Sequence, residues 1–284
     1  MERNYDLLSK SKFEEDGNVR DFIRWIRPKL DKENNFTHSY FHRDERKDYS
    51  FNSIYSAYSQ YNWNNKDYYE TKKTLDDLSK RIKENFKNGN QTDVYDVCIE
   101  ILKWGGVLPS NKEKLNGLCN QNELISYFKK TRKIFNYDYI NKIEIKDEKI
   151  FMSSGFTKIY SLLYDNFIIY DTRVAAAIAL LVKTFLDEKH NGGFFPHLLN
   201  FAVGNARVGK RDEKEILNSR NPSEGIIHFK KLYNNPWTFI ESNVRANWLL
   251  KMILNSYPDS KFGNEIDSLR KLESALFMIG YRVK

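Results

Sequence analysis

Apolar residues recur along this chain with the spacing of buried helix faces, and this spacing restricts the fold more than any other feature. After Thr92, the positions i, i+3, i+4, i+7 and i+8 are occupied by Val94, Val97, Cys98, Ile101 and Leu102. Gly105 and Gly106 follow and predict the end of that helix. Runs that alternate between apolar and polar residues, as half-buried strands do, are few. The pattern therefore predicts an all-α protein.

Further helices are expected from the same periodicity and from start and stop signals. Asn221-Pro222 and Asn235-Pro236 each place a capping residue before a proline at the first helical position. The expected helices cover residues 154–163, 171–186, 222–233, 236–256 and 265–279, the last one closed by Gly280.

Two segments interrupt this helical pattern. Residues 136–152 carry isoleucines among charges and predict either a short β-hairpin or an irregular insert. Residues 189–212 contain four glycines and predict a long loop. We expect a basic and aromatic helical region over residues 1–90, followed by a helical core over residues 91–284.

Composition and charge exclude several classes of protein. The 284 residues carry 46 Lys+Arg against 38 Asp+Glu, and the net charge of +8 favours polyanionic partners. The longest apolar stretch, residues 174–182, is far shorter than the roughly 20 residues of a membrane span. No hydrophobic signal core follows Met1. We therefore expect a cytoplasmic monomer with no membrane partner.

Two cysteines are too few for a four-thiolate metal site or a disulfide framework. The five histidines include the pair His38 and His42, but no H-E-x-x-H motif accompanies them. We therefore expect neither a metal nor a cofactor.

Aromatic residues lie among basic and amide residues between Phe36 and Tyr69. Such a mixture suits stacking on unpaired bases beside a phosphate-binding surface. The same mixture is also what a genome rich in Lys, Asn and Tyr codons produces, so composition alone leaves nucleic-acid binding open.

Asp171 stands where a hydrophobic approach, Ile168 to Tyr170, meets the start of an apolar helix. An aspartate in that position accepts hydrogen bonds from free helix amides, and the positive end of the helix dipole favours its ionised form. Its carboxylate can serve only as a helix cap, or it can also face a cleft. Both interpretations are open at the level of sequence.

The residues around Asp171 are similar to a known motif. Residues 169–174 read Ile-Tyr-Asp-Thr-Arg-Val and resemble the V-D-T-H-V motif of the helix-hairpin-helix DNA glycosylases, with Arg173 in place of the histidine. Residues 154–158 resemble the hairpin of that superfamily more loosely, because its second glycine is missing. The resemblance covers residues 152–186 and implies a two-lobed helical fold with a small β insert.

The resemblance also implies a chemistry and a set of site residues. Asp171 becomes the catalytic carboxylate, which stabilises an oxocarbenium-like sugar or activates water during hydrolysis of an N-glycosidic bond. Lys158 becomes a second catalytic candidate, the amine that forms a Schiff base in bifunctional members. It precedes Asp171 by fewer residues than is usual in the superfamily, which favours a monofunctional enzyme.

The partner implied is double-stranded DNA with one base turned out of the helix. A bulky modified pyrimidine of phage DNA is one candidate base, which would give the protein a role in antiviral defence. The residues expected to bind DNA are Ser154, Gly155, Phe156, Thr157, Arg173, Arg207 and Lys210. Trp63, Trp104 and Trp248 are candidates for the base pocket, with burial in the core as the alternative for each.

Two other functions are compatible with the sequence. A DNA-binding module on the same scaffold would need no catalytic group. A metal-dependent nuclease would use Glu144-Ile145-Lys146, which matches the E-x-K half of a nuclease motif, with Asp138 upstream.

Overall fold

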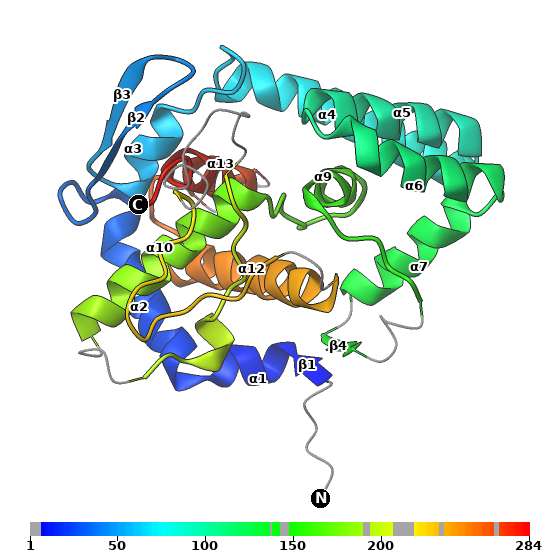
Figure 1. The fold of residues 1–284 in the computed structure, drawn as a ribbon. Helices are drawn as coiled ribbons and strands as arrows, with labels where there is room; N and C mark the ends of the chain where they lie inside the picture. Colours follow the sequence, from blue (N-terminus) through cyan, green and yellow to red (C-terminus); the bar gives the residue numbers. More distant parts are fainter. Residues whose placement is uncertain are drawn as a thin grey trace, which may run out of the picture.

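The computed structural model describes residues 7–136, 138–142, 148–189, 194–206, 219–232, 236–263 and 267–284. Most of them are helical (Figure 1), which confirms the all-α expectation at that level. Five helices lie where periodicity and capping predict them: α5 (Gln91–Trp104), α9 (Ser154–Leu163), α10 (Thr172–Lys189), α12 (Pro236–Ser256) and α13 (Ser268–Ile279). None of the helices in the described part of the chain is long and apolar enough to cross a membrane.

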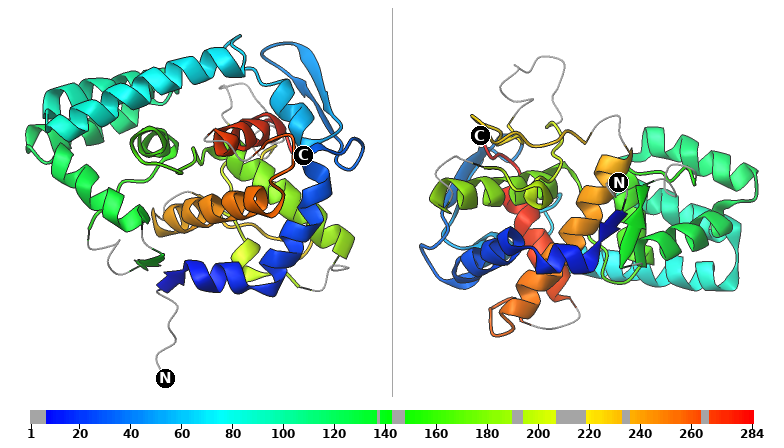
Figure 2. Two further views of the ribbon diagram at one scale, coloured as in Figure 1. Left: turned by 180° about the vertical axis from the view of Figure 1, so that it is seen from behind. Right: turned by 90° about the horizontal axis from the view of Figure 1, so that it is seen from below.

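The helices form two groups, which Figures 1 and 2 show side by side. The central group is contiguous in sequence and contains α4 (Tyr68–Asn88), α5, α6 (Leu108–Asn120), α7 (Leu124–Asn136) and α9. The terminal group combines both halves of the remaining chain: α1 (Lys10–Glu15), α2 (Gly17–Asp31) and α3 (Ile54–Ser59) pack with α10, α12 and α13.

The packing around residue 90, where the sequence suggests a change of region, is continuous. That position lies between α4 and α5, which pack against each other within the central group. The elements before α4 pack instead on C-terminal helices, with α3 against α13 and α2 against α12. The chain therefore divides in space at about residues 60–67 and 164–171, where it passes from one group to the other.

Two small antiparallel sheets complete the fold. Strands β2 (His38–His42) and β3 (Lys47–Phe51) form a hairpin that the sequence did not predict. Strand β4 (Tyr139–Asn141) lies within the predicted insert, but it pairs with β1 (Leu7–Ser9) rather than forming a hairpin of its own.

The helix expected after Asn221-Pro222 is absent, and that prediction was wrong. The Asn221 side chain accepts hydrogen bonds from both the amide and the hydroxyl of Ser223, which makes a local turn. The chain then pairs with the 201–203 segment, where Val203 donates to the Lys230 carbonyl and accepts from the Leu232 amide. A capping asparagine before proline starts turns as well as helices, and here backbone pairing with the 201–203 segment continues the turn as extended chain.

Candidate active-site cleft

A cleft of about 1360 Å³ lies between the central and terminal groups. Its walls come from α4, α5 and α9 on one side and from the β2–β3 hairpin, α10 and α13 on the other. The ionisable side chains that line it are Arg43, Lys47, Lys72, Lys158, Arg173, Arg220, Arg270 and Arg282, against Asp44, Glu45, Asp171 and Glu273. Among these Lys, Arg, Asp and Glu residues there are thus eight cations for four anions, and the local charge has the sign that suits a polyanion.

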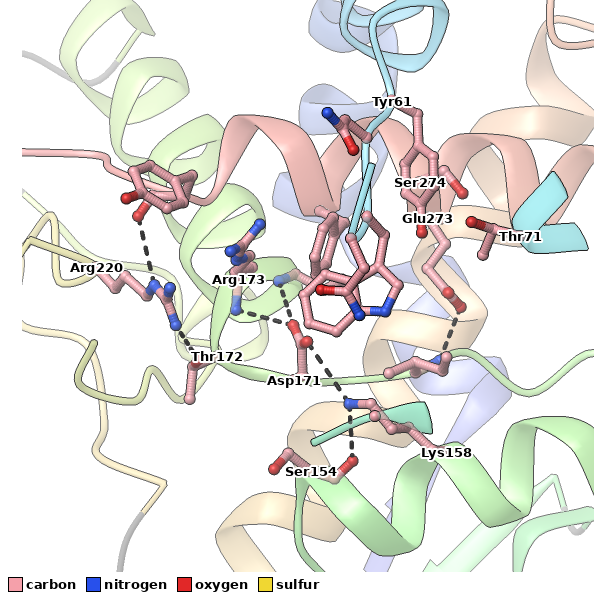
Figure 3. Close-up of a pocket in the computed structure, with 18 of the residues that line it drawn as sticks. Tyr61, Thr71, Ser154, Lys158, Asp171, Thr172, Arg173, Arg220, Glu273 and Ser274 are labelled. Carbon is pink, nitrogen blue, oxygen red and sulfur yellow. Dashed lines mark hydrogen bonds and ion pairs between the residues drawn. The ribbon is translucent and has the colours of Figure 1, made fainter. Parts of the chain in front are cut away.

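Asp171 caps α10 and lines the cleft at the same time (Figure 3). Its Oδ1 accepts hydrogen bonds from the amides of Arg173, at 2.9 Å, and Val174, at 3.0 Å. Its Oδ2 lies 3.8 Å from Lys158 Nζ. The two roles that the sequence left open therefore coexist, because each carboxylate oxygen serves one of them.

Lys158 reaches Asp171 from the neighbouring helix α9. Its side chain is nearly buried, and Nζ also donates to the Ser154 carbonyl at 3.2 Å. Gly105 makes room for it, since a Cβ at that position would lie 2.5 Å from Lys158 Cδ and 2.6 Å from Cε. Gly105, which the sequence predicts as the end of a helix, thus also leaves the space that the Lys158 side chain occupies.

The electrostatic surroundings keep Asp171 ionised. Burial by itself raises the pKa of its carboxyl group, but the charge of Lys158, the Val174 amide and the charges of Arg173 and Arg220 outweigh burial and lower the pKa. A buried carboxylate with a lowered pKa is available as an anion throughout the neutral range.

Arg173 lies in an aromatic cage beside Asp171. Its guanidinium carbon is 4.3 Å from the Phe277 ring centroid, 4.9 Å from that of Tyr281 and 5.8 Å from that of Trp63. Arg220 is held nearby, donating to the Thr172 hydroxyl and to the Tyr281 carbonyl. Arg173 lines the cleft, and a guanidinium group stacked on aromatic rings suits binding of an anion.

The structure places two of the three predicted tryptophans in the cleft. Trp63 and Trp104 both line it, with ring centroids 6.3 Å apart. Trp248 does not, because it is buried in the terminal group against Phe13. Its assignment to the base pocket was therefore wrong, and its role is in core packing.

The predicted phosphate-binding hairpin at residues 154–157 is instead the first turn of α9. Ser153 caps this turn, its hydroxyl accepting from the Phe156 amide and its carbonyl from the Thr157 amide. The side chains of Phe156 and Thr157 are fully buried, and a Cβ on Gly155 would collide with Asn111. These three residues are therefore not DNA contacts, whereas Ser154 does line the cleft.

Arg207 and Lys210, the two predicted DNA contacts in the glycine-rich segment, lie outside the described residues. The same is true of Glu144-Ile145-Lys146, on which the nuclease alternative depends. Within the described ranges, no group of three or more His, Cys, Asp or Glu side chains could hold a metal ion.

Sequence reasoning missed two charged residues of the site, Arg220 and Glu273. Glu273 is a second buried carboxyl group that lines the cleft from α13, and burial raises its pKa despite its pairing with Arg270. Its position on the inner face of a predicted helix, where a charge needs a partner, was the signal that could have identified it.

The hairpin residues at the rim of the cleft were not singled out either. His42 stacks on Tyr281 with ring centroids 3.9 Å apart, and Glu45 lies beside it. His38, four residues away, contacts the carbonyls of Ile279 and Arg282 instead. The two histidines thus fix the hairpin to the end of α13 rather than facing a common ligand.

Comparisons with protein-family models, with curated proteins and with solved structures gave no match to this chain, and its function is therefore inferred from the geometry of the cleft.

Proposed function

We propose that the chain is a DNA glycosylase that hydrolyses the N-glycosidic bond of a base accommodated in the cleft. The observation that carries the proposal is the meeting of Asp171 and Lys158 at the base of a basic cleft with aromatic walls. Each component has a function in this chemistry. Asp171 and Lys158 are close in sequence, whereas the aromatic walls come from distant segments.

Asp171 would act on the sugar. Departure of the base leaves positive charge on C1′ and the ring oxygen, and a fixed carboxylate stabilises that charge electrostatically or takes a proton from the attacking water. The lowered pKa of Asp171 keeps it in the anionic form that either role needs. Because Oδ1 is occupied by the helix amides, Oδ2 is the oxygen that faces the reaction.

The aromatic wall would hold the base. Trp63, Trp104 and Phe277 line the cleft, and aromatic rings can stack on any planar base. Pockets for small ligands usually have volumes of roughly 300–1000 Å³. The cleft, at about 1360 Å³, exceeds that range and suits a base with a bulky substituent together with its sugar and phosphate.

Phe41 would meet the duplex at the rim. Of the five large apolar side chains exposed in the described residues, it is the one that lines the cleft, and 46% of its surface is accessible. Its neighbours Tyr40 and His42 are buried and anchor the strand on Tyr281 and Met278. A rigidly held apolar side chain is what a protein inserts between base steps when it unstacks DNA.

Lys158 gives a second candidate activity on the same substrate. As a neutral amine it would attack C1′, displace the base and leave a Schiff base that leads to strand cleavage. The specific observation in favour is its position on the wall of the cleft, 3.8 Å from Asp171. Its ammonium must first lose a proton to solvent, because the ionised Asp171 stabilises the charged form.

The test uses duplexes containing uracil, 8-oxoguanine, alkylated bases, and hydroxymethylated or glucosylated cytosine, incubated in EDTA. Breaks that appear only after alkali, and that vanish with Asp171→Asn, are expected for hydrolysis. Breaks without alkali, together with a borohydride-trapped complex lost in Lys158→Gln, would establish the lyase activity. Binding without any product would leave a DNA-binding module, and cleavage that requires magnesium would overturn the proposal.

A further inference from the structure

Glu273, which is buried, and Arg270, which is partly buried, form an ion pair on α13 that contacts both halves of the site. Arg270 Nη1 donates to both carboxylate oxygens of Glu273, at 2.7 and 2.8 Å. Neither side chain is needed to cover the core, because an apolar residue would do so without the cost of burying two charges. Their remaining hydrogen bonds indicate what they do instead.

One of these bonds fixes the approach to Asp171. Glu273 Oε2 accepts a hydrogen bond of 2.8 Å from the Ile169 amide, two residues before Asp171 (Figure 3). Asn247 holds the preceding amide, that of Ile168, in the same way. The extended segment that leads to Asp171 is therefore fixed by side chains rather than by a β-ladder.

The other bond reaches the helix that carries Lys158. Arg270 Nη2 donates to the Ser161 carbonyl on α9 at 3.2 Å, and the Ser161 hydroxyl donates to the Lys158 carbonyl at 2.9 Å. One ion pair on α13 thus connects the backbone near Asp171 with the backbone near Lys158.

We propose that Glu273 and Arg270 are positioning residues that set the separation between Lys158 and Asp171. The assignment rests on the proposed function for its catalytic meaning, but the geometry that it describes can be measured without any DNA. The charged groups near Asp171 are Lys158 from α9, Arg173 from α10, Arg220 from the 219–232 segment and Glu273 from α13.

Arg270→Lys tests the proposal while keeping the charge. A lysine can pair with Glu273 but cannot also reach Ser161, because a single ammonium group replaces the guanidinium fork. Loosening α9 moves Lys158 away from Asp171, so the pKa of the Asp171 carboxyl is expected to rise. The measurement is a pH titration of the carboxyl carbon by NMR on aspartate-labelled protein, assigned with Asp171→Asn.

Glu273→Gln distinguishes two effects on the pKa of Asp171: that of the Glu273 charge and that of the position of Lys158. Loss of the Glu273 charge by itself would lower the pKa of Asp171, whereas loss of positioning raises it because Lys158 recedes. A rise in both variants supports the proposal. A fall in Glu273→Gln, or no change in Arg270→Lys, overturns it.

The matched control is Arg81→Lys. Arg81 makes a bidentate ion pair with Glu100, in which Nη1 and Nη2 donate to the two carboxylate oxygens at 2.7 and 2.6 Å. Neither residue lines the cleft. This variant is expected to leave the Asp171 titration unchanged.

On a DNA that the wild-type protein processes, Arg270→Lys should lower kcat by about tenfold or more with little change in KM, since misplacement by about 1 Å can cost a factor of 10². Should no DNA be processed, the NMR titration still decides the positioning role. Failure of the glycosylase proposal and failure of this one are thus distinguishable.

Discussion

Lys158 Nζ lies 3.8 Å from Asp171 Oδ2, although the two residues belong to different helices and their chain segments are separated by a turn. Both side chains are largely buried and both line the same cleft. A buried ion pair is costly to assemble, and in a protein of this size it is a weak contributor to stability. The location of this pair in a cleft therefore favours the proposed role in catalysis over a role in stability.

Replacing Asp171 should remove activity without removing the fold. Asp171→Asn keeps an oxygen that can accept from the Arg173 and Val174 amides, because asparagine caps helices about as well as aspartate. We expect base excision to fall by roughly 10²–10⁴, the range for loss of a general base. The check is single-turnover excision together with thermal unfolding. A variant that is unfolded, or that keeps its excision activity, would contradict the prediction.

Gly105→Ala should impair the site from a distance. The new Cβ would collide with the Lys158 side chain, which must move away from Asp171. Gly117→Ala is the matched control, since it lies in α6 with nothing within 4 Å of the added Cβ. We expect slower excision in the first variant only, and a gain of about 0.5–1 kcal/mol in the free energy of unfolding in the second. Equal activity of the two would refute the packing argument.

Asp171 should also contribute to the pH dependence of stability. Its pKa is lower in the folded protein than in the unfolded chain, so its contribution is present above the unfolded value and is lost as pH falls through the folded one. Urea unfolding of Asp171→Asn should therefore lose less stability than wild type on acidification below about pH 4, near the ordinary aspartate pKa.

Asp165→Asn is the control for that titration. The pKa of Asp165 is also lowered, chiefly by its hydrogen bond from Lys83, but its side chain is 74% exposed. Solvent screens such a pair, so this variant should follow the wild-type profile closely. If both variants showed the same pH dependence of stability, burial of the Asp171–Lys158 pair would not increase its contribution to that dependence.

Phe41→Ala should affect duplex DNA more than single strands. If Phe41 fills the gap left by the base, its loss slows excision from paired DNA and reduces the fluorescence of 2-aminopurine placed next to the target. Phe194→Ala removes an aromatic side chain that is even more exposed and does not line the cleft, and it should have no effect. An equal loss of excision activity on single-stranded and paired DNA would contradict the insertion of Phe41 between base steps.

Much of the helical framework follows from the sequence, because its signals are local. The apolar stripe from Val94 to Leu102 and the proline after Asn235 predict α5 and α12 without any knowledge of their neighbours. The stretch after Asn221 shows the limit of such signals, since the same capping pair there begins a turn whose continuation pairs with residues 201–203.

The site was only partly predictable for the same reason. Asp171 was found because its role as a helix cap is local, and Lys158 because it is close in sequence. Glu273 and Arg220 reach the cleft through packing between distant segments. The charge on the inner face of a predicted helix marks Glu273 as a residue that needs a partner, but a single sequence does not say which partner. The β2–β3 hairpin was hidden because tyrosine and histidine occupy its inward positions, so its alternation is weak on a hydrophobic scale.

The order in which the two helical groups are completed has a consequence for synthesis. The central group is a continuous stretch of chain and can fold as soon as it leaves the ribosome, with mainly local contacts. The terminal group must wait for α13, which docks against α3 and α10 from the far end of the chain. A nascent chain therefore carries Asp171 and Lys158 well before the cleft has its second wall, and the cleft is completed only when translation is nearly finished.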